Sequence, residues 1–397
     1  MRRGLTLGGA LLSSLLMLSS ASAQETKGLA PGVLSLDNSV GVLDKAIEDG
    51  KSSIEKALGI SISGFLDTSY TYSTNYPRSL ANISGRYFDK DHNKVVFNTF
   101  NLTLEKPEKD WGVGFKVVGD FGRMAELLRE ATFWSDRLGD EPSAELREAF
   151  VTTTIPIGEG LAIKGGLFVT PLGTEIIPAP NAYNDNISRS FAFNFGVPLR
   201  HLGVLLSYPL LKVLTISAGP VTGWDNPHDQ NDGVSFLGGV AFTPMDSFAL
   251  ASNVVYGAEQ RDRSGPKRFA WSSVATIKPF DPLVVYLEYV YGFEEFKAAK
   301  DGSWHGLAAI GSYGWTDRFS TALRGEVFFD NNGSRTGFGR DVDLGEITLT
   351  AAYKFTSKLL GRVEVRQDWS DKAFYQRGRT RADENQTTFA LQAIYTF

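Results

Sequence analysis

The chain has 397 residues, of which 42% are hydrophobic, 12% aromatic and 21% charged, and its mean hydropathy is −0.13. This composition excludes a disordered chain and a bundle of membrane helices, whose spans would raise the mean hydropathy well above zero. Cysteine is absent, which excludes disulfides and cysteine-ligated zinc, and a net charge of −5 gives no footprint for nucleic acid. The length suits two soluble domains or one large barrel.

Residues 1–23 have the pattern of a secretory signal peptide. Arg2 and Arg3 precede a short apolar stretch, and Ala21-Ser22-Ala23 provides a small-x-small cleavage site. An uncleaved membrane anchor fits less well, because serines interrupt the apolar stretch and it is short for a span. We therefore expect an exported protein.

Residues 24–59 carry a heptad pattern that predicts a short periplasmic helix. Its apolar positions are spaced alternately by four and three residues: Leu36, Val40, Leu43, Ile47, Gly50, Ile54 and Ala57. The segment is either a coiled coil that joins subunits or a single amphipathic helix. In the second case it rests on the rim, or enters the lumen, of the barrel that the rest of the sequence predicts.

From Ile60 onward the sequence is a series of alternating segments. Phe100, Leu102 and Leu104, for example, are separated by polar residues. Segments of about ten residues suit tilted strands that cross a bilayer, whereas strands of soluble sandwiches average about five or six. The sequence predicts sixteen strands, with fourteen or eighteen as alternatives, at 60–72, 95–106, 111–120, 145–155, 161–169, 198–208, 213–224, 234–243, 247–257, 268–278, 283–292, 303–313, 318–329, 343–355, 359–369 and 385–397.

The connections alternate between short turns and long polar loops. Proline cannot donate to a sheet ladder, so we expect five prolines to end strands before short turns: Pro107, Pro156, Pro209, Pro244 and Pro279. The long loops are predicted at 73–94, 121–143, 170–196, 225–233, 258–267, 293–302, 330–341 and 370–384. This asymmetry is typical of an antiparallel outer-membrane β-barrel at 60–397, and sixteen strands leave room for an aqueous channel.

Several motifs resemble one family. They include Leu146-Arg-Glu-Ala-Phe-Val151, Gly166-Leu-Phe-Val-Thr-Pro-Leu-Gly173, His201-Leu-Gly-Val204 and Gly223-Trp-Asp-Asn226. Together they are similar to the putative β-barrel porin-2 (outer-membrane-protein-L-like) family, over about 60–397. Phe397, at the end of an alternating aromatic strand, resembles the C-terminal signal read by outer-membrane assembly machinery. The resemblance implies an outer-membrane pore but supplies neither a solute nor functional residues.

Loop 170–196 is the candidate pore constriction. Prolines stiffen it, and Glu175, Asp185 and Arg189 give it charge. We predict that it folds inward and narrows the channel. The alternative is a loop that packs over the mouth or against a neighbouring subunit.

Strand parity assigns the charged residues that face the lumen. Six basic and nine acidic positions predict a water-filled, weakly cation-leaning lumen, because unsolvated charges would be too costly. We favour a generic solvated wall over a dedicated row of binding sites for a solute. Arg362, Glu364 and Arg366 are expected to form a mutual ion-pair row. The inward set is Lys116, Lys164, Arg268, Arg324, Arg362, Arg366, Asp67, Glu105, Asp120, Glu148, Glu288, Glu326, Glu346, Glu364 and Asp368.

Two other classes of function are alternatives to the pore. A barrel enzyme would need a base such as histidine, and only His92, His201, His228 and His305 are available. Parity turns His201 inward, where we expect it to orient loop 170–196 by a hydrogen bond and not to catalyse a reaction. A receptor or adhesin would bind through its long loops, and loop 121–143 is apolar enough for a short helix that needs a cover.

The sequence therefore predicts an outer-membrane porin for passive diffusion of small hydrophilic solutes or ions. Its partners would be outer-membrane lipid, the diffusing solutes and further copies of itself, with a trimer as the candidate oligomer. We expect no cofactor, no metal, no nucleic-acid partner and no catalysis.

Overall fold

The computed structural model describes residues 51–52, 55–78, 82–108, 112–131, 143–179, 183–227, 230–297 and 300–397. The predicted signal peptide and most of the predicted helix at 24–59 lie outside these residues. The described end of that segment is helical at 51–52 and 55–58. Residues 51–397 form one compact unit. No helix among the described residues is long and apolar enough to span a membrane.

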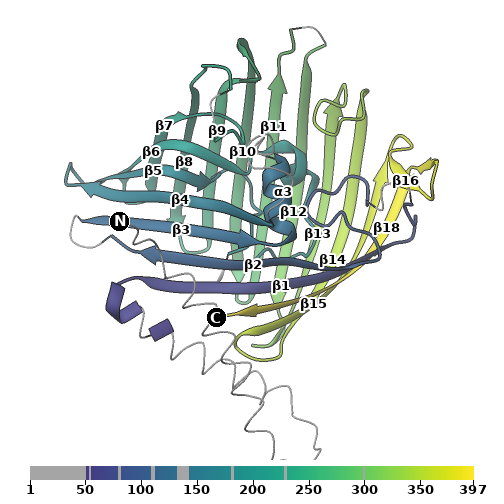
Figure 1. Cartoon of the computed structure of the whole chain (residues 1–397), viewed down its shortest axis with the longest axis horizontal. Helices are drawn as coiled ribbons and strands as arrows, with labels where there is room; N and C mark the ends of the chain where they lie inside the picture. The colour runs from purple at the N-terminus through teal and green to yellow at the C-terminus, as the bar shows by residue number, and fades with distance from the viewer. Residues whose placement is uncertain are drawn as a thin grey trace, which may run out of the picture. The chain divides into compact units, whose positions relative to one another are not determined.

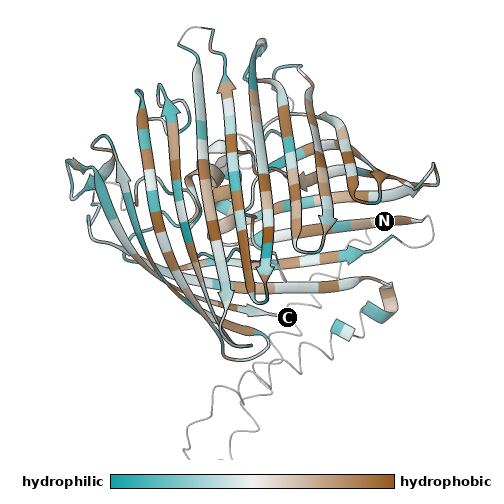
Figure 2. Ribbon diagram, turned by 180° about the vertical axis from the view of Figure 1, so that it is seen from behind, coloured by the Kyte–Doolittle hydropathy of each residue, from teal (hydrophilic) through white to brown (hydrophobic). Residues whose placement is uncertain are grey.

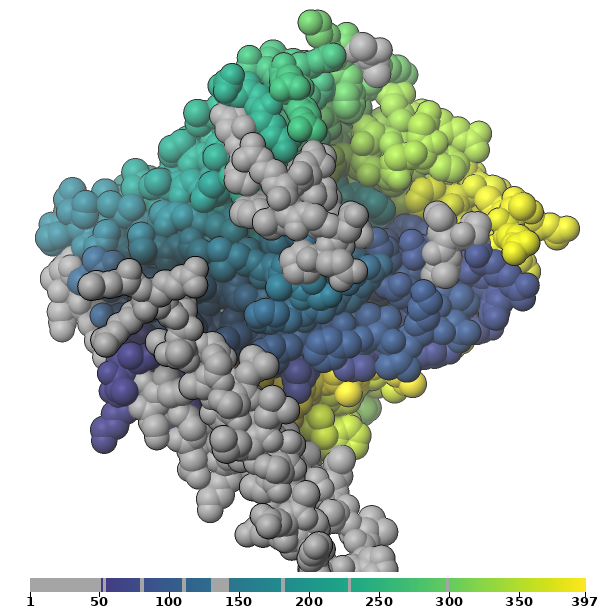
Figure 3. Space-filling model, in the orientation of Figure 1, coloured from purple at the N-terminus to yellow at the C-terminus, as the bar shows by residue number. Residues whose placement is uncertain are grey.

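Sixteen of the described strands close into one antiparallel barrel in which each strand pairs with its neighbours along the chain (Figure 1). The first and last strands close it, with register from Phe65 opposite Thr396 to Ser73 opposite Thr388. Figure 3 shows the blue atoms of the first strands beside the yellow atoms of the last ones. The strands are β1 (Ser61–Ser73), β2 (Val95–Lys106), β3 (Val113–Phe121), β4 (Ala144–Ile155), β5 (Leu161–Val169), β6 (Arg200–Leu211), β7 (Leu214–Val221), β8 (Ser235–Met245), β9 (Phe248–Gln260), β10 (Arg263–Phe280), β11 (Leu283–Glu294), β12 (Gly302–Gly314), β13 (Phe319–Asn331), β14 (Val342–Lys354), β15 (Leu359–Ser370) and β18 (Asn385–Thr396).

The predicted architecture of sixteen strands is confirmed, and β2 and β5 have the predicted bounds. The largest difference is at the predicted loop 258–267, which is wrong. There β9 continues to Gln260 and β10 already begins at Arg263, so that only Arg261 and Asp262 form the turn. Ladder hydrogen bonds do not require apolar side chains, so a polar hairpin can extend beyond the membrane and be mistaken for a loop.

The prediction that prolines end the strands is only partly correct. Pro107 and Pro156 follow their strands, but Pro209, Pro244 and Pro279 lie inside the last residues of β6, β8 and β10. The pairing register shifts across Pro244 and Pro279, which have no partner in the neighbouring strand, and directly after Pro209, which is paired with Thr215. A bulge leaves one residue without a ladder partner, so it accommodates a residue that has no N–H group.

The two faces of the wall differ in chemistry, as the alternating colours along the strands in Figure 2 show. On β15 the side chains of Val363 and Val365 are 51% and 38% exposed, whereas those of Arg362, Glu364 and Arg366 are at most 6% exposed. An apolar outer face suits lipid, and the inner face carries the charge. The low mean hydropathy is thus an average over two dissimilar faces.

Four further elements lie in the long connections: α3 (Arg123–Ala131), the π-helical turn η2 (Ala192–Gly196), and the hairpin β16 (Tyr375–Arg377) and β17 (Arg381–Asp383). The short helix expected in loop 121–143 is therefore present. Its Met124, Leu127 and Leu128 are buried. Met124 and Leu128 belong to an apolar cluster that also includes Phe191 and Phe193 and residues of the barrel wall such as Leu237, Val290 and Phe328. The barrel therefore has a packed apolar core of its own, built from loops and wall.

Candidate pore constriction and lumen

The connection between β5 and β6 lies inside the barrel. At its start, the amide of Gly173 donates to Ser272 Oγ over 3.1 Å and the amide of Thr174 donates to Glu288 Oε2 over 3.0 Å. Asn253 Nδ2 on β9 donates to the carbonyl of Pro171 over 2.8 Å. The loop thus leaves β5 and reaches the inner face of β9 to β11.

Two glutamates hold the return of the loop to the opposite wall. Glu364 on β15 accepts from the amides of Ile187 and Ser188 over 2.6 and 3.0 Å. Glu326 on β13 accepts from the amides of Phe191 and Ala192 over 2.5 and 2.6 Å. Each glutamate satisfies two buried loop amides at once, and a buried amide without an acceptor would be costly.

Arginines complete this attachment. Arg324 pairs with Glu175 of the loop over 2.9 Å and with Glu346 over 2.6 Å, and it donates to the carbonyl of Ser188 over 2.7 Å. Arg366 donates to the carbonyl of Arg189 over 2.6 Å. Both arginine side chains are fully buried. Their charge therefore stabilises the loop and is not presented to water.

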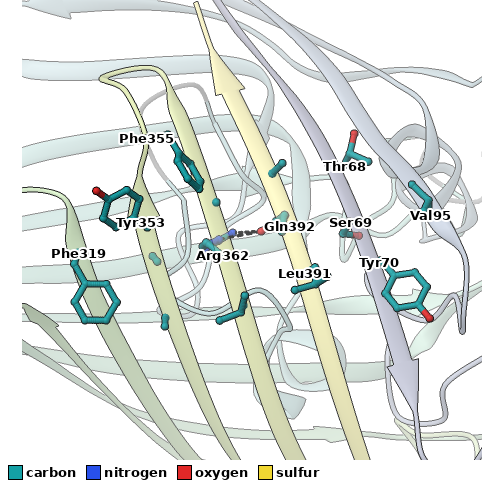
Figure 4. Close-up of a pocket in the computed structure, with 15 residues that line it drawn as sticks. Thr68, Ser69, Tyr70, Val95, Phe319, Tyr353, Phe355, Arg362, Leu391 and Gln392 are labelled. Atoms are coloured by element: carbon teal, nitrogen blue, oxygen red, sulfur yellow. Dashed lines mark hydrogen bonds between the residues drawn. The ribbon is translucent and has the colours of Figure 1, made fainter. Parts of the chain in front are cut away.

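The expected ion-pair row of Arg362, Glu364 and Arg366 is wrong. Arg362 Nε donates to Gln392 Oε1 over 2.9 Å, an interaction that Figure 4 shows as a dashed line. Arg366 pairs with Asp368 over 2.6 Å, and Glu364 binds the loop. Residues two apart on a strand share a face, as Arg366 and Asp368 do, but β18 supplies the closer partner for Arg362 and the loop supplies those for Glu364.

The other two predicted loop charges also lie within the barrel. Arg189 is buried, donates to the carbonyl of Ile187 over 2.8 Å and lies 5.8 Å from the centre of the Phe88 ring. Asp185 is half-buried and accepts from Ser312 Oγ over 3.1 Å. These contacts place the middle of the loop between β12 and the first long connection.

The predicted lysines lie on the other side of the lumen. Lys116 on β3 pairs with Glu148 on β4 over 3.1 Å, and its side chain keeps 25% of its exposure. The ammonium of Lys164 on β5 lies 5.0 Å from the centre of the Phe150 ring and is half-buried. This wall therefore retains charge that water can reach.

His201 on β6 connects the start of the loop to the next connection. Its Nδ1 lies 3.0 Å from the carbonyl of Gly223, and its Nε2 lies 3.0 Å from Thr170 Oγ1. Because the carbonyl can only accept, Nδ1 carries the proton and Nε2 accepts from the Thr170 hydroxyl. Both ring nitrogens are used, which suits positioning of the loop.

The remaining histidines differ in their surroundings. His92 accepts from the amide of Ser73 over 3.0 Å, while its sequence neighbour Asp91 pairs with Arg123 over 2.9 Å. His305 stacks on Phe329. His228 lies outside the described residues. Adjacency in sequence thus does not make Asp91 and His92 an acid–base pair.

Arg147 is an attachment point that strict parity misses. The register between β3 and β4 shifts between Val118 and Gly119, so that both Arg147 and Glu148 are buried. Arg147 Nε donates to Asp120 over 2.6 Å, and its NH1 donates to the loop carbonyl of Pro178. Alternation in the sequence carries no sign of the extra residue that a bulge inserts.

Asp225 is a second group that the sequence did not indicate. It lies in the connection between β7 and β8, is buried, and accepts from the amides of Leu199 and Arg200 over 2.6 and 2.8 Å. Burial raises the pKa of its carboxyl to about 6, although the two amides and nearby Arg200 act in the opposite direction. This carboxyl fixes the point where the loop ends and β6 begins.

A closed sixteen-stranded barrel with an apolar outer face, a charged inner face and an inward loop belongs to the porin class of outer-membrane proteins. The chain matches the family model described as putative beta-barrel porin-2, OmpL-like, over residues 59–397. It therefore belongs to that family, as its motifs suggested, and its location is the outer membrane.

Solved structures with the same fold agree with this assignment. An anion-selective porin from Comamonas acidovorans is 12% identical, with a TM-score of 0.60 over 85% of this chain and 99% of that one. The outer-membrane channel DcaP of Acinetobacter baumannii is 12% identical, with a TM-score of 0.58 over 85% and 97%. A trimer form of OmpT from Vibrio cholerae is 14% identical, with a TM-score of 0.56 over 85% and 99%. The comparison with curated proteins gave no match.

Proposed function

We propose that the protein is a passive channel for small hydrophilic solutes or ions, narrowed by the loop between β5 and β6. The loop divides the lumen, and its hydrogen bonds hold it mainly to β9–β15. The free passage then lies toward β3–β5, where Lys116 and Lys164 line it. Family membership supports the pore, and the attachment of the loop supports the constriction.

One observation carries this proposal: the side chain of Lys116 keeps 25% of its exposure although it points into the barrel. A charged side chain inside the wall that remains accessible implies water beside it. By contrast, the arginines on β13 and β15 are sealed by the loop. We infer that the buried charges hold the constriction, while the accessible charges select the solute.

Conductance in planar bilayers tests the channel. We expect stepwise currents in KCl, and a graded series of sugars should reduce them up to the size that no longer enters. Deleting 175–190 should raise the single-channel conductance. Unchanged conductance and ion selectivity after the deletion would contradict the constriction, and no conductance in the intact protein would favour a barrel that only anchors binding loops.

Catalysis has no support in the fold, and we propose that His201 positions the loop. Its two ring nitrogens are bonded to Thr170 and Gly223, and a general base needs a free nitrogen directed at a substrate. Assays for lipase and protease activity on the purified barrel should give no turnover. Activity that is lost on His201→Phe would overturn this assignment.

We further propose that the protein is a homo-oligomer, with a trimer expected. Thr68, Ala393 and Gly361 are paired across β1, β18 and β15 and form a row of small residues. They line an outer hollow of about 570 Å³ that Phe355 and Leu391 flank (Figure 4). Such a concave surface lets the wall of a second barrel approach closely. OmpT supplies a trimeric example of the same fold.

Filling this hollow tests the oligomer. Ala393→Trp should reduce the mass measured by light scattering in detergent, whereas Val240→Trp, at an exposed position on β8, should leave it unchanged. An intact oligomer with Ala393→Trp would place the interface elsewhere. Truncation of 24–58 then decides between a coiled coil, whose loss dissociates the oligomer, and a helix on the barrel, whose loss does not.

A further inference from the structure

A small cavity lies between the loop and the wall of β11 and β12. Its volume is about 190 Å³, and its lining includes Asp185 and Asn186 of the loop together with Tyr286 and Ile310 of the wall. Tyr286 lies near the start of β11 and Ile310 near the end of β12, so the cavity is nearer to the short turns. In an outer-membrane barrel the short turns face the periplasm. The cavity is therefore on the periplasmic side of the constriction.

Asn186 is among the residues that line this cavity, and its amide oxygen is buried. The residue is 1% exposed, and its Nδ2 donates to Thr350 Oγ1 over 2.7 Å. The Thr350 hydroxyl proton is already donated to Glu364 over 2.7 Å, so Thr350 can only accept from Asn186. This fixes the orientation of the amide. No group among the described residues donates to Oδ1 of Asn186.

Asp185 adds a negative charge. One of its oxygens accepts from Ser312 Oγ over 3.1 Å, and no described residue donates to the other. It forms no ion pair with a described residue, whereas Glu175, which also lines the cavity, is neutralised by Arg324 over 2.9 Å. Arg362 lies near but donates to Gln392 and to the carbonyl of Asn184. The cavity thus has one uncompensated carboxylate.

Asp185 and Asn186 contribute acceptors to the cavity, and the Thr174 hydroxyl, which also lacks a partner among the described residues, can donate or accept. A carboxylate oxygen and an amide oxygen cannot donate, and the Tyr286 hydroxyl can act in either direction. A buried acceptor without a donor is costly, so a ligand that supplies N–H groups gains both hydrogen bonds and charge compensation. A volume of about 190 Å³ greatly exceeds the space that one water needs.

We propose that this cavity binds the ammonium end of a small organic cation as it passes the constriction. The proposal rests on the channel function proposed above and adds a solute class to it. A primary ammonium has three donors for Asp185, Asn186 and Tyr286, whereas a quaternary ammonium has the same charge and no donor. The site should therefore bind a primary ammonium more tightly than a quaternary ammonium.

Channel block measures this discrimination. With the full chain in a planar bilayer, n-butylammonium should reduce the KCl current at lower concentration than tetramethylammonium does. Asp185→Asn should raise the half-blocking concentration of n-butylammonium by about tenfold, the equivalent of about 1.4 kcal/mol. Asp317→Asn is the matched control: it removes the same charge from an exposed periplasmic turn and should change nothing.

Equal block by the two cations, or equal block of the wild type and Asp185→Asn, would overturn the proposal. Calorimetric titration of the detergent-solubilised barrel with n-butylammonium makes the test independent of conduction. If the protein conducts no current but binds n-butylammonium through Asp185, the channel function fails and the binding site stands. If it conducts and shows neither block nor binding, only the site fails.

Discussion

The walls at β13–β15 and β3–β5 carry similar numbers of charges and use them differently. On β13–β15, Arg324, Glu326, Glu364 and Arg366 are buried and bound to the loop. On β3–β5, Asp120 and Arg147 are buried as well. Lys116, however, keeps 25% of its side-chain exposure beside Glu148, and Lys164 is half-buried. A count of lumen charges treats the two walls alike, and it therefore mixes groups that hold structure with groups that can meet a solute.

The difference predicts that mutations of buried charges and mutations of solvated charges separate stability from selectivity. Removing a buried charge leaves its partner unpaired in a medium of low dielectric constant, which is strongly destabilising. Changing a solvated charge alters the local potential at little cost to folding. Each kind of charge can thus be tested by a property that the other kind should leave nearly unaffected.

The largest effect is expected from Glu326→Ala combined with Glu364→Ala. The change leaves four loop amides without acceptors, and each buried amide that loses its acceptor costs about 1–3 kcal/mol. The loop should become sensitive to protease, and the single-channel conductance should rise. Glu105→Ala, at an exposed position on the periplasmic rim, is the control. A protease-resistant loop in the double variant would show that these glutamates do not hold it.

The next effect is expected at Arg147 on β4, which holds the loop to the wall of β3–β5 through the carbonyl of Pro178. Arg147→Met leaves Asp120 buried without its ion pair and should lower the free energy of unfolding by about 3–5 kcal/mol. Urea unfolding in detergent, followed by tryptophan fluorescence, measures this loss. Adding Asp120→Asn should recover much of it, because the uncompensated charge is then removed. No recovery would assign the loss to packing.

Lys164→Glu should shift ion selectivity toward cations and leave the unfolding curve nearly unchanged. A unit charge about 4 Å from a passing ion contributes about 1 kcal/mol even in bulk water, so reversing its sign changes the energy by about 2 kcal/mol, enough for at least a several-fold change in the permeability ratio. Reversal potentials in a KCl gradient report this ratio. Lys212→Glu makes the same charge change in a periplasmic turn and should have no effect. An unchanged reversal potential would remove Lys164 from the passage.

The last expected effect depends on pH and concerns Asp225. Its pKa is about 6 in the folded protein and 3.8 ordinarily, so the folded state holds the proton more tightly. Stability should therefore increase as the pH falls from above 6 toward 4. Asp225→Asn keeps an acceptor for the two amides and should remove this dependence, with a gain of at most about 3 kcal/mol at neutral pH. A variant that unfolds with the wild-type pH dependence would contradict this account.

The barrel could be predicted from the sequence because lipid on one side imposes a period of two on every strand. That period located β2 and β5 to the residue and placed Lys116, Lys164 and Arg324 inside. It could not locate Arg147, because a bulge changes the period without changing the composition. The partners of Glu326 and Glu364 were equally hidden, because they depend on the path of a loop that has no period.

The attachment of the loop also has a consequence for biogenesis. The acceptors of the Phe191 and Ile187 amides come 135 and 177 residues later in the chain, on β13 and β15. A nascent sheet that lacks these strands has no acceptors for the returning half of the loop and still has an open edge at β1, whose last partner is β18. Contacts of such large sequence separation form late. The constriction should therefore form only when the barrel closes. A half-assembled intermediate would have both an unpaired edge strand and a loop that is not yet held across the lumen.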